Sequence, residues 1–386
     1  MSNEFRGYVR PSGRVGVRNH LLILSVTGLT GPTARRISAC LPGSVVIDFP
    51  YDGGLLGEDR AAQDRALAGL GSNPNAGAVL LIGANTVRVG KFTELFSVAG
   101  TPVTAITLDE CGHDAVTLTE RGIRAGALLS KVISGLRREP VSLLNLTLGL
   151  ECGRSDPSSG LVSNPLLGLI ADRVVDSGGV AMIGESVEWM GAEHLLAARA
   201  ATPDVAQKIQ AAVDGREGLA VAGGIDLTGN NPGPSNIAGG LSTIEEKSLG
   251  NIAKSGSRPI QSVVAWAEAP AGPGFHLMDA CSYAPESLTG FSGAGAQLLL
   301  FTTGVGNSYV NASAPTIKVG ANPETSERLN EQLDYACPAV FSGDMALEQA
   351  AEELFVVLVD VASGTRTWGE ILGEGGESFS RMGASI

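Results

Sequence analysis

The chain has little cysteine, few aromatic residues and few positive charges. Its five cysteines, among 386 residues, form no CxxC pair, which argues against a disulfide framework and against a structural zinc site. The net charge of −13 argues against a surface that binds nucleic acid or anionic membranes. No apolar run approaches the ~20 residues that span a bilayer, and the first residues lack the apolar segment of a signal peptide. We therefore expect a cytoplasmic protein with no nucleic-acid partner and no membrane partner.

Glycine and aliphatic residues are abundant, and apolar runs alternate with helix-like segments. Glycine accounts for 52 residues and hydrophobic residues for 44% of the chain, a composition that suits many tight strand–helix turns. The alternation predicts an α/β fold with two Rossmann-like parallel-sheet domains that carry helices on both faces. The polar stretch 137–140 marks the expected boundary between an N-terminal domain, 1–140, and a C-terminal domain, 141–386, which carries most of the site. Near the end of the chain we expect helices at 330–335 and 347–363.

One βαβ unit of the second domain ends both of its strands in polar residues. The first apolar strand, 143–150, runs into Cys152, Arg154, Ser155 and Asp156. A helix is expected at about 165–176, and a second strand at 180–183. Four further polar groups follow that second strand: Glu185, Glu188, Glu193 and His194. The carboxyl ends of parallel strands form the crevice where ligands bind, so these residues predict a functional site.

The residue types in this unit allow more than one chemistry. Thiol, carboxylate and imidazole groups are ligands for a divalent transition metal, and carboxylate and imidazole also serve as general acids and bases. Cys152 can equally be a nucleophile or an inert buried residue, and no histidine lies close in sequence to activate it. The four residues after the second strand can also be the solvated beginning of a helix.

Several other segments place polar groups where they could contact a substrate. Arg14, Arg18 and Asn19 precede a buried strand at 21–26, where the arginines could bind a carboxylate or make ordinary ion pairs. Asn236, Gly239 and Gly240 lead into a helix at 244–253 that carries Lys247, an arrangement that can hold an anion although it is no P-loop. Polar residues also follow two later strands: Asp279 and the Thr302–Thr303 turn. The glycines near residue 293 lack the features of a nicotinamide-binding fingerprint.

A set of short motifs in one order carries a resemblance to a known family. They are Gly7-Tyr8-x-Arg10, Gly13-Arg14-x-Gly16-x-Arg18-Asn19, Asn73-Pro74-Asn75, Cys152-Gly153-x-Ser155-Asp156, Asn164-Pro165, Glu185-x-x-Glu188, Gly191-x-Glu193-His194, Asn236-x-x-Gly239-Gly240-Leu241-x-Thr243-x-Glu245-Glu246-Lys247 and Phe301-Thr302-Thr303-Gly304. These residues resemble the large C-terminal part of the altronate/galactarate dehydratase family. The resemblance runs from Gly7 to about Pro338.

The resemblance implies a lyase that carries out β-elimination from a 2-hydroxy carboxylate with a divalent metal, Fe(II) in first place and Mn(II) or Mg(II) as alternatives. Sugar-acid dehydratases of the family carry further cysteines in the first domain, whereas this chain has no cysteine or histidine near Gly28–Gly31 or Gly83–Asn85. In that departure it resembles the large-subunit form of the family, which acts on sulfolactate. That form implies a small SAF-like subunit on a separate chain, an oligomeric assembly and a small anionic hydroxy acid as substrate.

Roles for the site residues follow as expectations from the resemblance and the residue chemistry. We expect the metal at Cys152, Glu185, Glu193 and His194. We expect catalytic roles for Glu188, His194, Lys247 and Asp279. The substrate would be held by Arg14, Arg18, Asn19, Ser155, Asp156, Asn236, Gly239, Gly240, Thr302 and Thr303. Release of sulfite from 3-sulfolactate is the leading reaction, dehydration of a sugar acid is the alternative, and a non-catalytic scaffold subunit is a third reading.

Overall fold

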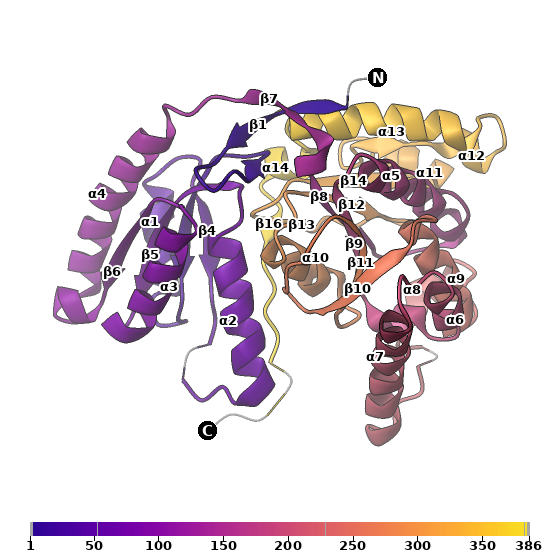
Figure 1. The fold of residues 1–386 in the computed structure, drawn as a ribbon, viewed down its shortest axis with the longest axis horizontal. Helices are drawn as coiled ribbons and strands as arrows, with labels where there is room; N and C mark the ends of the chain where they lie inside the picture. The colour runs from indigo at the N-terminus through magenta and orange to yellow at the C-terminus, as the bar shows by residue number, and fades with distance from the viewer. Residues whose placement is uncertain (1–2, 52, 228, 382, 384–386) are drawn as a thin grey trace.

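Two parallel β-sheets lie side by side in the molecule, each with its own helices (Figure 1). The structure is a computed structural model, and it describes every residue except 1–2, 52, 228, 382 and 384–386. Both sheets are parallel throughout and helices cover both faces of each, so the predicted α/β class is confirmed. No helix among the described residues is long and apolar enough to cross a membrane. The cytoplasmic location stays a prediction.

The first unit is a four-stranded sheet in the order β4-β3-β5-β6. Its strands are β3 (His20–Ser25), β4 (Val45–Asp48), β5 (Ala76–Gly83) and β6 (Val103–Thr107), and its helices are α1 (Gly31–Ala39), α2 (Gly57–Gly71), α3 (Thr86–Val98) and α4 (Ala115–Ile133). Residues of α1 and α4 form one apolar cluster with the sheet, and residues of α2 and α3 form another on the opposite face. Every residue of β5 is buried, as expected for a strand covered on both faces.

The second unit is a seven-stranded sheet in the order β10-β11-β9-β8-β12-β14-β15. Its strands are β8 (Thr147–Cys152), β9 (Val180–Ile183), β10 (Ile260–Ala265), β11 (Gly274–Asp279), β12 (Leu298–Thr302), β14 (Thr316–Gly320) and β15 (Tyr335–Ala336). Its helices are α5 (Asn164–Asp176), α6 (Glu193–Ala197), α7 (Pro203–Ala222), α8 (Pro234–Ala238), α9 (Ile244–Ile252), α10 (Ala284–Gly293), α11 (Pro323–Arg328), α12 (Pro338–Phe341), α13 (Leu347–Ala362) and α14 (Trp368–Leu372).

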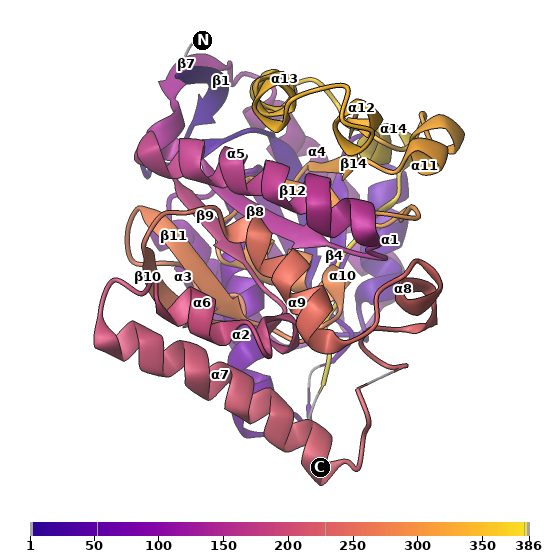
Figure 2. The same cartoon turned by 90° about the vertical axis from the view of Figure 1, so that its right-hand side faces the viewer.

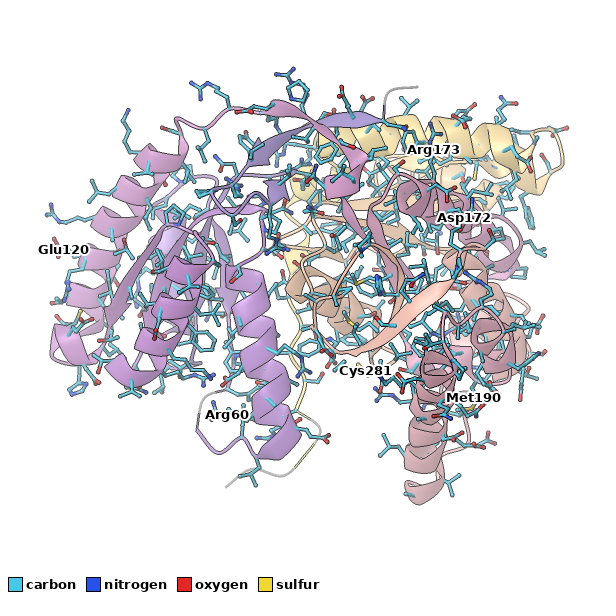
Figure 3. The ribbon with its side chains drawn as sticks, in the orientation of Figure 1. Arg60, Glu120, Asp172, Arg173, Met190 and Cys281 are labelled. Carbon is cyan, nitrogen blue, oxygen red and sulfur yellow. The ribbon has the colours of Figure 1, made fainter. Side chains whose placement is uncertain are left out.

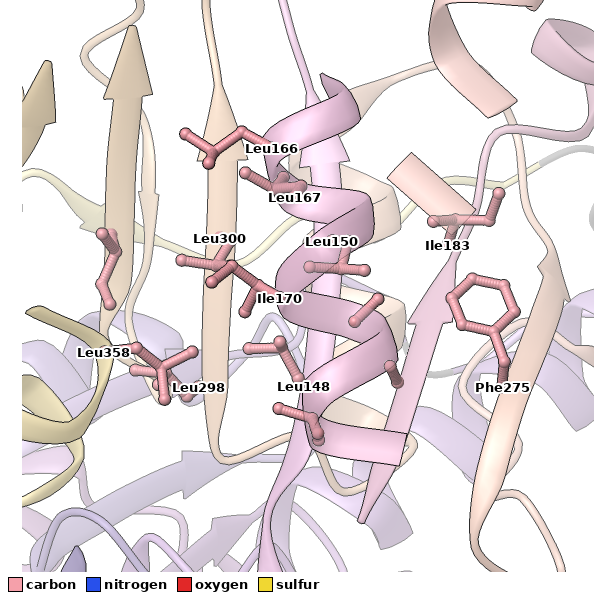
Figure 4. Packing of buried hydrophobic residues seen from close by; sticks show 14 of the residues in the cluster. Leu148, Leu150, Leu166, Leu167, Ile170, Ile183, Phe275, Leu298, Leu300 and Leu358 are labelled. Atoms are coloured by element: carbon pink, nitrogen blue, oxygen red, sulfur yellow. The ribbon is translucent and has the colours of Figure 1, made fainter. Parts of the chain in front are cut away.

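Alternate residues of the central strands pack on opposite faces of this sheet. Leu298 and Leu300 of β12 join the cluster that contains α5 and α13, whereas Leu299 and Phe301 join the cluster that contains α10. Helix α5 lies across β8, β9 and β12 (Figure 2). Its buried apolar side chains, among them Leu166, Leu167 and Ile170, pack against those of the strands (Figure 4). Burial of each of these leucines stabilises the fold by about 1.5–3 kcal/mol relative to leaving the side chain exposed. This packing fixes the strand ends that carry the site.

Both ends of the chain tie the two units together. Strand β1 (Glu4–Val9) pairs antiparallel with β7 (Glu139–Ser142) and with β2 (Val15–Gly16), so the expected boundary after residue 140 lies inside a strand. At the other end, β16 (Gly375–Gly376) pairs with β13 (Val310–Asn311), and the chain then returns to the first unit. There the ring of Phe379 lies 5.1 Å, edge to face, from the ring of Phe49.

Most expected elements are present, but one expected helix is absent and several observed elements, among them α10 and β14, were not expected. The helix expected at 330–335 is wrong: this segment is a turn that leads into β15, because Asp334 exchanges hydrogen bonds with Lys318 of β14 instead of continuing a helix. Helix α10 was not expected, because its glycines and serines are weak helix formers that tertiary packing overrides. The helix expected at 347–363 is confirmed as α13.

Candidate active site

The site lies at the point where the chain reverses its direction across the second sheet. Strands β8 and β12 are neighbours, but the chain leaves β8 toward β9 on one side and leaves β12 toward β14 on the other. The two loops therefore diverge and open a crevice at the carboxyl ends of the strands, which is where doubly wound folds bind ligands. Cys152, at the end of β8, is the register partner of Thr302, at the end of β12.

Three potential metal ligands converge in this crevice. They are Glu151, Cys152 and Glu185. Each offers one ligand atom, and these three atoms all lie within 4.8 Å of one another. All three side chains are buried, with exposed fractions of 0%, 4% and 3%. Glu185 follows β9 in a left-handed conformation, with φ of 61°, which is unfavourable for a residue with a side chain and clusters at functional sites. Its Oε2 atom is buried and has no hydrogen-bond partner among the described residues.

Glu151 is held from three directions. Its Oε1 atom accepts hydrogen bonds from Lys254 Nζ at 2.8 Å and from the backbone nitrogen of Cys152 at 3.0 Å. Its Oε2 atom accepts a hydrogen bond from the Ser287 hydroxyl. Burial by itself would lower the pKa of Lys254, but the negative groups around it outweigh burial and raise the pKa above its ordinary value. Lys254 therefore remains an ammonium ion and neutralises part of the charge of the group.

The electrostatics of the other two potential ligands favour their neutral forms. Burial raises the pKa of the Cys152 thiol; Lys254 opposes the rise and the carboxylate of Glu188 adds to it. Burial, followed by the carboxylates of Glu151 and Glu188, raises the pKa of Glu185 well above its ordinary value. A bound cation would reverse this situation, because it favours the thiolate and the carboxylate that coordinate it.

An ion pair stands next to the three ligands. Lys247 Nζ, on α9, lies 2.5 Å from Glu188 Oε1 and donates a second hydrogen bond of 2.5 Å to Asn231 Oδ1. Glu188 Oε2 lies 3.9 Å from Cys152 Sγ, so the pair and the ligands form one cluster. Burial would lower the pKa of Lys247, but the carboxylates of Glu188 and Glu185 outweigh it and raise that pKa. Lys247 is therefore a cation that can bind an anion.

Local structure explains how these side chains reach the crevice. Glu188 belongs to a short 3-10 helix, Ser186–Trp189, that follows β9. Ser186 exchanges backbone and side-chain hydrogen bonds with Ala280, after β11, and also donates to the Asp279 carboxylate. Asp279 in turn pairs with Arg216 of α7 at 2.7 Å. Asp279 thus positions the loop of Glu185 and Glu188. Figure 3 labels two residues of these loops, Met190 and Cys281, in the lower part of the second unit.

Helix α9 brings Lys247 to the site from a distant part of the sequence. It begins after Thr243, whose hydroxyl accepts a hydrogen bond from the backbone nitrogen of Glu246 at 3.2 Å, a cap of the kind worth about 1 kcal/mol. Asn251, near its end, donates from Nδ2 to the Glu188 carbonyl at 3.2 Å, and its Oδ1 lies 3.4 Å from Cys152 Sγ. The beginning of α9 was predicted correctly from the sequence.

Two cavities open onto this cluster. The larger, of 520 Å³, is lined by Cys152, Arg154, Glu185, Glu188 and Lys247, together with Asn231, Tyr283 and Asn307. The smaller, of 300 Å³, shares Cys152 and Lys247 and is otherwise mostly apolar. A small polar molecule in the larger cavity could contact two of the potential metal ligands, Cys152 and Glu185, and two cationic side chains, Arg154 and Lys247.

The donor set fits a divalent metal ion. Glu185 offers an unpartnered carboxylate oxygen, Cys152 offers sulfur, and Glu151 has acceptor capacity beyond its three hydrogen bonds. A buried carboxylate oxygen without a partner is costly, and coordination would satisfy it. Sulfur is a soft ligand that suits iron or zinc and does not suit magnesium. The group could therefore hold a transition metal.

Two of the four predicted metal ligands lie elsewhere. His194 is exposed, and Glu193 is half-buried; neither belongs to the group of three within the described residues. The chain turns at Gly191, with φ of 81°, before α6 begins at Glu193, so both residues come after this turn and stand outside the group of three. We therefore leave both residues out of the proposed metal site, and His194 out of the proposed catalytic groups.

The predicted arginine motif lies at the opposite edge of the second sheet. The carbonyl of Val15 accepts a hydrogen bond from Gln297, which immediately precedes β12, and Arg14 is exposed and donates to the Ser72 carbonyl at 2.9 Å. The five residues of β12 span about 16 Å between that edge and Thr302. This placement corrects the prediction that Arg14 contacts the substrate.

Arg18 and Asn19 are occupied by contacts within the chain. Arg18 is buried and makes a two-pronged ion pair with Glu370 through Nε and Nη2, at 2.6 and 2.8 Å. Its Nη1 and Nη2 atoms also donate to backbone carbonyls. Asn19 accepts a hydrogen bond from Arg10 and donates to the Ile133 carbonyl. Both residues join segments of the chain, so we no longer assign them to the substrate.

Most other predicted substrate residues hold the loops of the crevice in place. Asp156 accepts hydrogen bonds from Ser158, Ser159 and Asn322. Asn236 donates to the Ser155 carbonyl at 2.8 Å and Thr302 donates to Asn164 at 2.6 Å, while the Thr303 hydroxyl accepts from the Gly306 nitrogen. Gly239 packs on Asp156, and Gly240, with φ of 109°, provides a turn before α9. The Ser155 hydroxyl differs: it lines the smaller cavity and has no partner among the described residues.

Sequence reasoning missed four residues of the site: Glu151, Asn231, Asn251 and Lys254. Glu151 had a signal, since a carboxylate inside an otherwise apolar buried strand requires a partner or a function. Lys254 and the two asparagines had none, because their roles depend on packing between distant segments. Arg154 was recognised as a polar neighbour of Cys152, but it was given no role in the site.

Comparison with known proteins gives two family matches that together cover nearly the whole chain. The model described as D-galactarate/altronate dehydratase, C-terminal, matches residues 143–384. The model described as D-galactarate dehydratase/altronate hydrolase, second domain, matches residues 7–134. The border between them falls within 134–143, close to the predicted boundary.

Individual relatives cover the same length. The chain is 36% identical to the (2R)-sulfolactate sulfo-lyase subunit beta of Chromohalobacter salexigens, over 96% of this chain and 95% of that protein. It is 31% identical to an altronate dehydratase of Escherichia coli, over 95% of this chain and 75% of that protein. It is 30% identical to an altronate dehydratase of Bacillus subtilis, over 94% of this chain and 75% of that protein.

Proposed function

Because the chain belongs to the D-galactarate/altronate dehydratase family, we propose that it is the large subunit of a metal-dependent lyase that releases sulfite from (2R)-3-sulfolactate and forms pyruvate. The family places it among enzymes of the lyase class. The observation that carries the proposal is the buried group of Glu151, Cys152 and Glu185, which opens into a cavity with two cationic side chains. The choice of sulfolactate rests on the sulfo-lyase relative, which this chain matches over 95% of that protein's length.

Cys152 and Glu185, with Glu151, would hold the metal. The thiol favours Fe(II) over the harder ions Mn(II) and Mg(II) among the metals expected from the sequence. When bound, such an ion supplies a Lewis acid that polarises the 2-hydroxy carboxylate of the substrate. Lys254 stays outside this set, since it is a cation and has no lone pair to offer.

The chain's own residues account for proton removal and charge stabilisation. Elimination begins when a base takes the proton from C2, and the pair of electrons left there expels sulfite from C3. Glu188 is the base we propose, because its carboxylate lines the cavity beside the metal ligands. Lys247 binds the substrate carboxylate, whose negative charge grows as the proton leaves. The released enol then takes up a proton at C3 and becomes pyruvate.

Water is kept from the reacting groups by burial. Glu188 is 3% exposed, and Cys152 and Glu185 are similarly buried. A low-dielectric surrounding strengthens the attraction between Lys247 and a developing enediolate. The same arrangement serves dehydration, in which hydroxide leaves C3, so a sugar-acid dehydratase is the second candidate; the two altronate dehydratases favour it.

A second chain completes the proposed enzyme. The name of the sulfo-lyase relative, subunit beta, indicates that this relative works with another subunit. By analogy we propose a small partner subunit for this chain, of the SAF-like type expected from the sequence, and an oligomeric assembly. Isolation of the tagged chain from its native cells would recover such a partner.

The test compares substrates under identical conditions. The chain, purified without oxygen together with its co-purifying partner and supplied with Fe(II), is incubated with 3-sulfolactate, altronate or galactarate. Equal amounts of sulfite and pyruvate from sulfolactate support the proposal. A keto-acid without sulfite, formed only from altronate or galactarate, identifies a dehydratase. Absence of both metal and turnover identifies a scaffold subunit.

A further inference from the structure

One arginine lines the larger cavity but has no role in metal binding, proton removal or binding of the substrate carboxylate. Arg154 is exposed and lines this cavity with Cys152 and Lys247. Within the described part of the chain, no group accepts a hydrogen bond from its guanidinium and no carboxylate pairs with it. Lys247, by contrast, already pairs with Glu188. Arg154 is therefore the cation of the described cavity lining that is left without an anionic partner.

The backbone of Arg154 is fixed in an unfavourable conformation. Its φ is 55°, in the left-handed region where glycine is relaxed and a residue with a side chain is strained. Its carbonyl accepts hydrogen bonds from the backbone nitrogens of Gly304 and Val305, both at 3.3 Å, and Gly153 donates to the Thr302 carbonyl at 3.0 Å. A strained residue with an unpaired charge on a well-fixed loop points to a functional role for its side chain.

Arg154 also lies close to the potential metal ligands. It follows Cys152 by two residues, so their Cα atoms are at most about 7 Å apart. Both residues line the same cavity of 520 Å³ with Glu185, so one small ligand can lie with one end at Cys152 and Glu185 and with a second group at the guanidinium. The planar guanidinium offers two parallel donors, which match a carboxylate or a sulfonate.

We propose that Arg154 binds the second anionic group of the substrate and so makes the site selective for short 2-hydroxy acids with two negative charges. This assignment rests on the proposed function, because it takes the 2-hydroxy carboxylate end to lie at the metal ligands. Under that function the second group is the sulfonate of sulfolactate. Altronate carries one carboxylate and would not use Arg154.

Equilibrium binding tests the assignment without requiring turnover. The chain, with its metal and its partner, is titrated calorimetrically with 3-sulfolactate and with lactate, which lacks the second anion. We expect Arg154→Gly to weaken the binding of sulfolactate about 10- to 100-fold and to leave lactate binding unchanged. Arg154→Lys keeps the positive charge but lacks the two parallel donors of the guanidinium, so it should give an intermediate loss of sulfolactate affinity.

A stability measurement separates this role from a structural one. Glycine relaxes the left-handed conformation, so Arg154→Gly should leave Tm unchanged or raise it by up to about 3 °C. The matched control is His113→Gly, at an exposed position with φ of 64° that does not line the cavity. We expect the control to behave similarly in Tm and to bind both acids like the unsubstituted protein.

The outcomes distinguish failure of this inference from failure of the proposed function. Equal weakening of both acids by Arg154→Gly, or no weakening of either, overturns the role of Arg154. Release of sulfite with an unchanged KM in Arg154→Gly overturns it too and leaves the proposed function standing. Selective binding of sulfolactate through Arg154, without any release of sulfite, supports the inference and contradicts the proposed reaction. Failure of the unsubstituted protein to bind sulfolactate contradicts both.

Discussion

The ammonium group of Lys254 lies 2.8 Å from the carboxylate of Glu151, and neither side chain is exposed to solvent. Removing one partner of such a pair leaves a buried charge without compensation, so Lys254→Met should lower the free energy of unfolding by about 3–5 kcal/mol. Urea denaturation measures this loss. Lys208→Met, which removes an exposed partner of Asp204, is the control and should leave the urea midpoint unchanged. A Lys254→Met variant as stable as the unsubstituted protein would contradict a stabilising role for this ion pair.

Lys247 is expected to act on the reaction more than on the fold. Lys247→Met removes the cation that we assign to the substrate carboxylate, and kcat/KM for elimination should fall about 100- to 1000-fold. Steady-state assays of sulfite and pyruvate measure the effect. Lys247→Arg keeps the charge and should recover part of the activity. Full activity of Lys247→Met would remove this residue from the mechanism.

Arg18 is expected to stabilise the fold and not to bind the substrate. Because it pairs with Glu370 and binds several carbonyl groups within the chain, Arg18→Met should lower the free energy of unfolding by about 3 kcal/mol or more. The KM of the folded fraction for its substrate should not change. A raised KM with unchanged stability would return Arg18 to the substrate site.

Glu377 should make stability depend on pH. Burial raises the pKa of this carboxyl to about 7, against hydrogen bonds from Ser313 and Asn311 that favour its charged form, while the ordinary value is 4.5. The folded chain therefore holds a proton that the unfolded chain releases, and stability falls as pH rises from about 4.5 to about 7. The urea midpoint of Glu377→Gln, measured across this range, should rise relative to that of the unsubstituted protein as the pH increases, because the variant lacks the carboxyl group that titrates. Parallel curves would contradict the assignment.

The βαβ unit of the site could be predicted from the sequence because its information is local. Apolar runs identified β9 at its observed bounds and α5 within a residue. The carboxyl ends of neighbouring parallel strands meet at one edge, so Cys152 and Glu185 had to lie close together. Both belong to the group of potential metal ligands.

The rest depends on packing between distant segments. Lys254 reaches Glu151 across 103 residues, and Arg18 reaches Glu370 across 352, and no local pattern signals either pair. His194 has the chemistry of a ligand, but it follows the turn at Gly191 and is exposed. Residue type and strand order thus locate a site, whereas tertiary contacts decide which residues take part in it.

The metal content of the protein tests the central claim most directly. The chain, purified without oxygen with its partner, is analysed for iron, manganese, zinc and magnesium by mass spectrometry. We predict about one transition-metal ion per chain, lost in Cys152→Ser and in Glu185→Gln because each removes a donor. Cys337→Ser, which changes a buried cysteine outside the group, should keep the metal. An unsubstituted chain without metal, or a Cys152→Ser chain with the full amount, would contradict a metal centre at Glu151, Cys152 and Glu185.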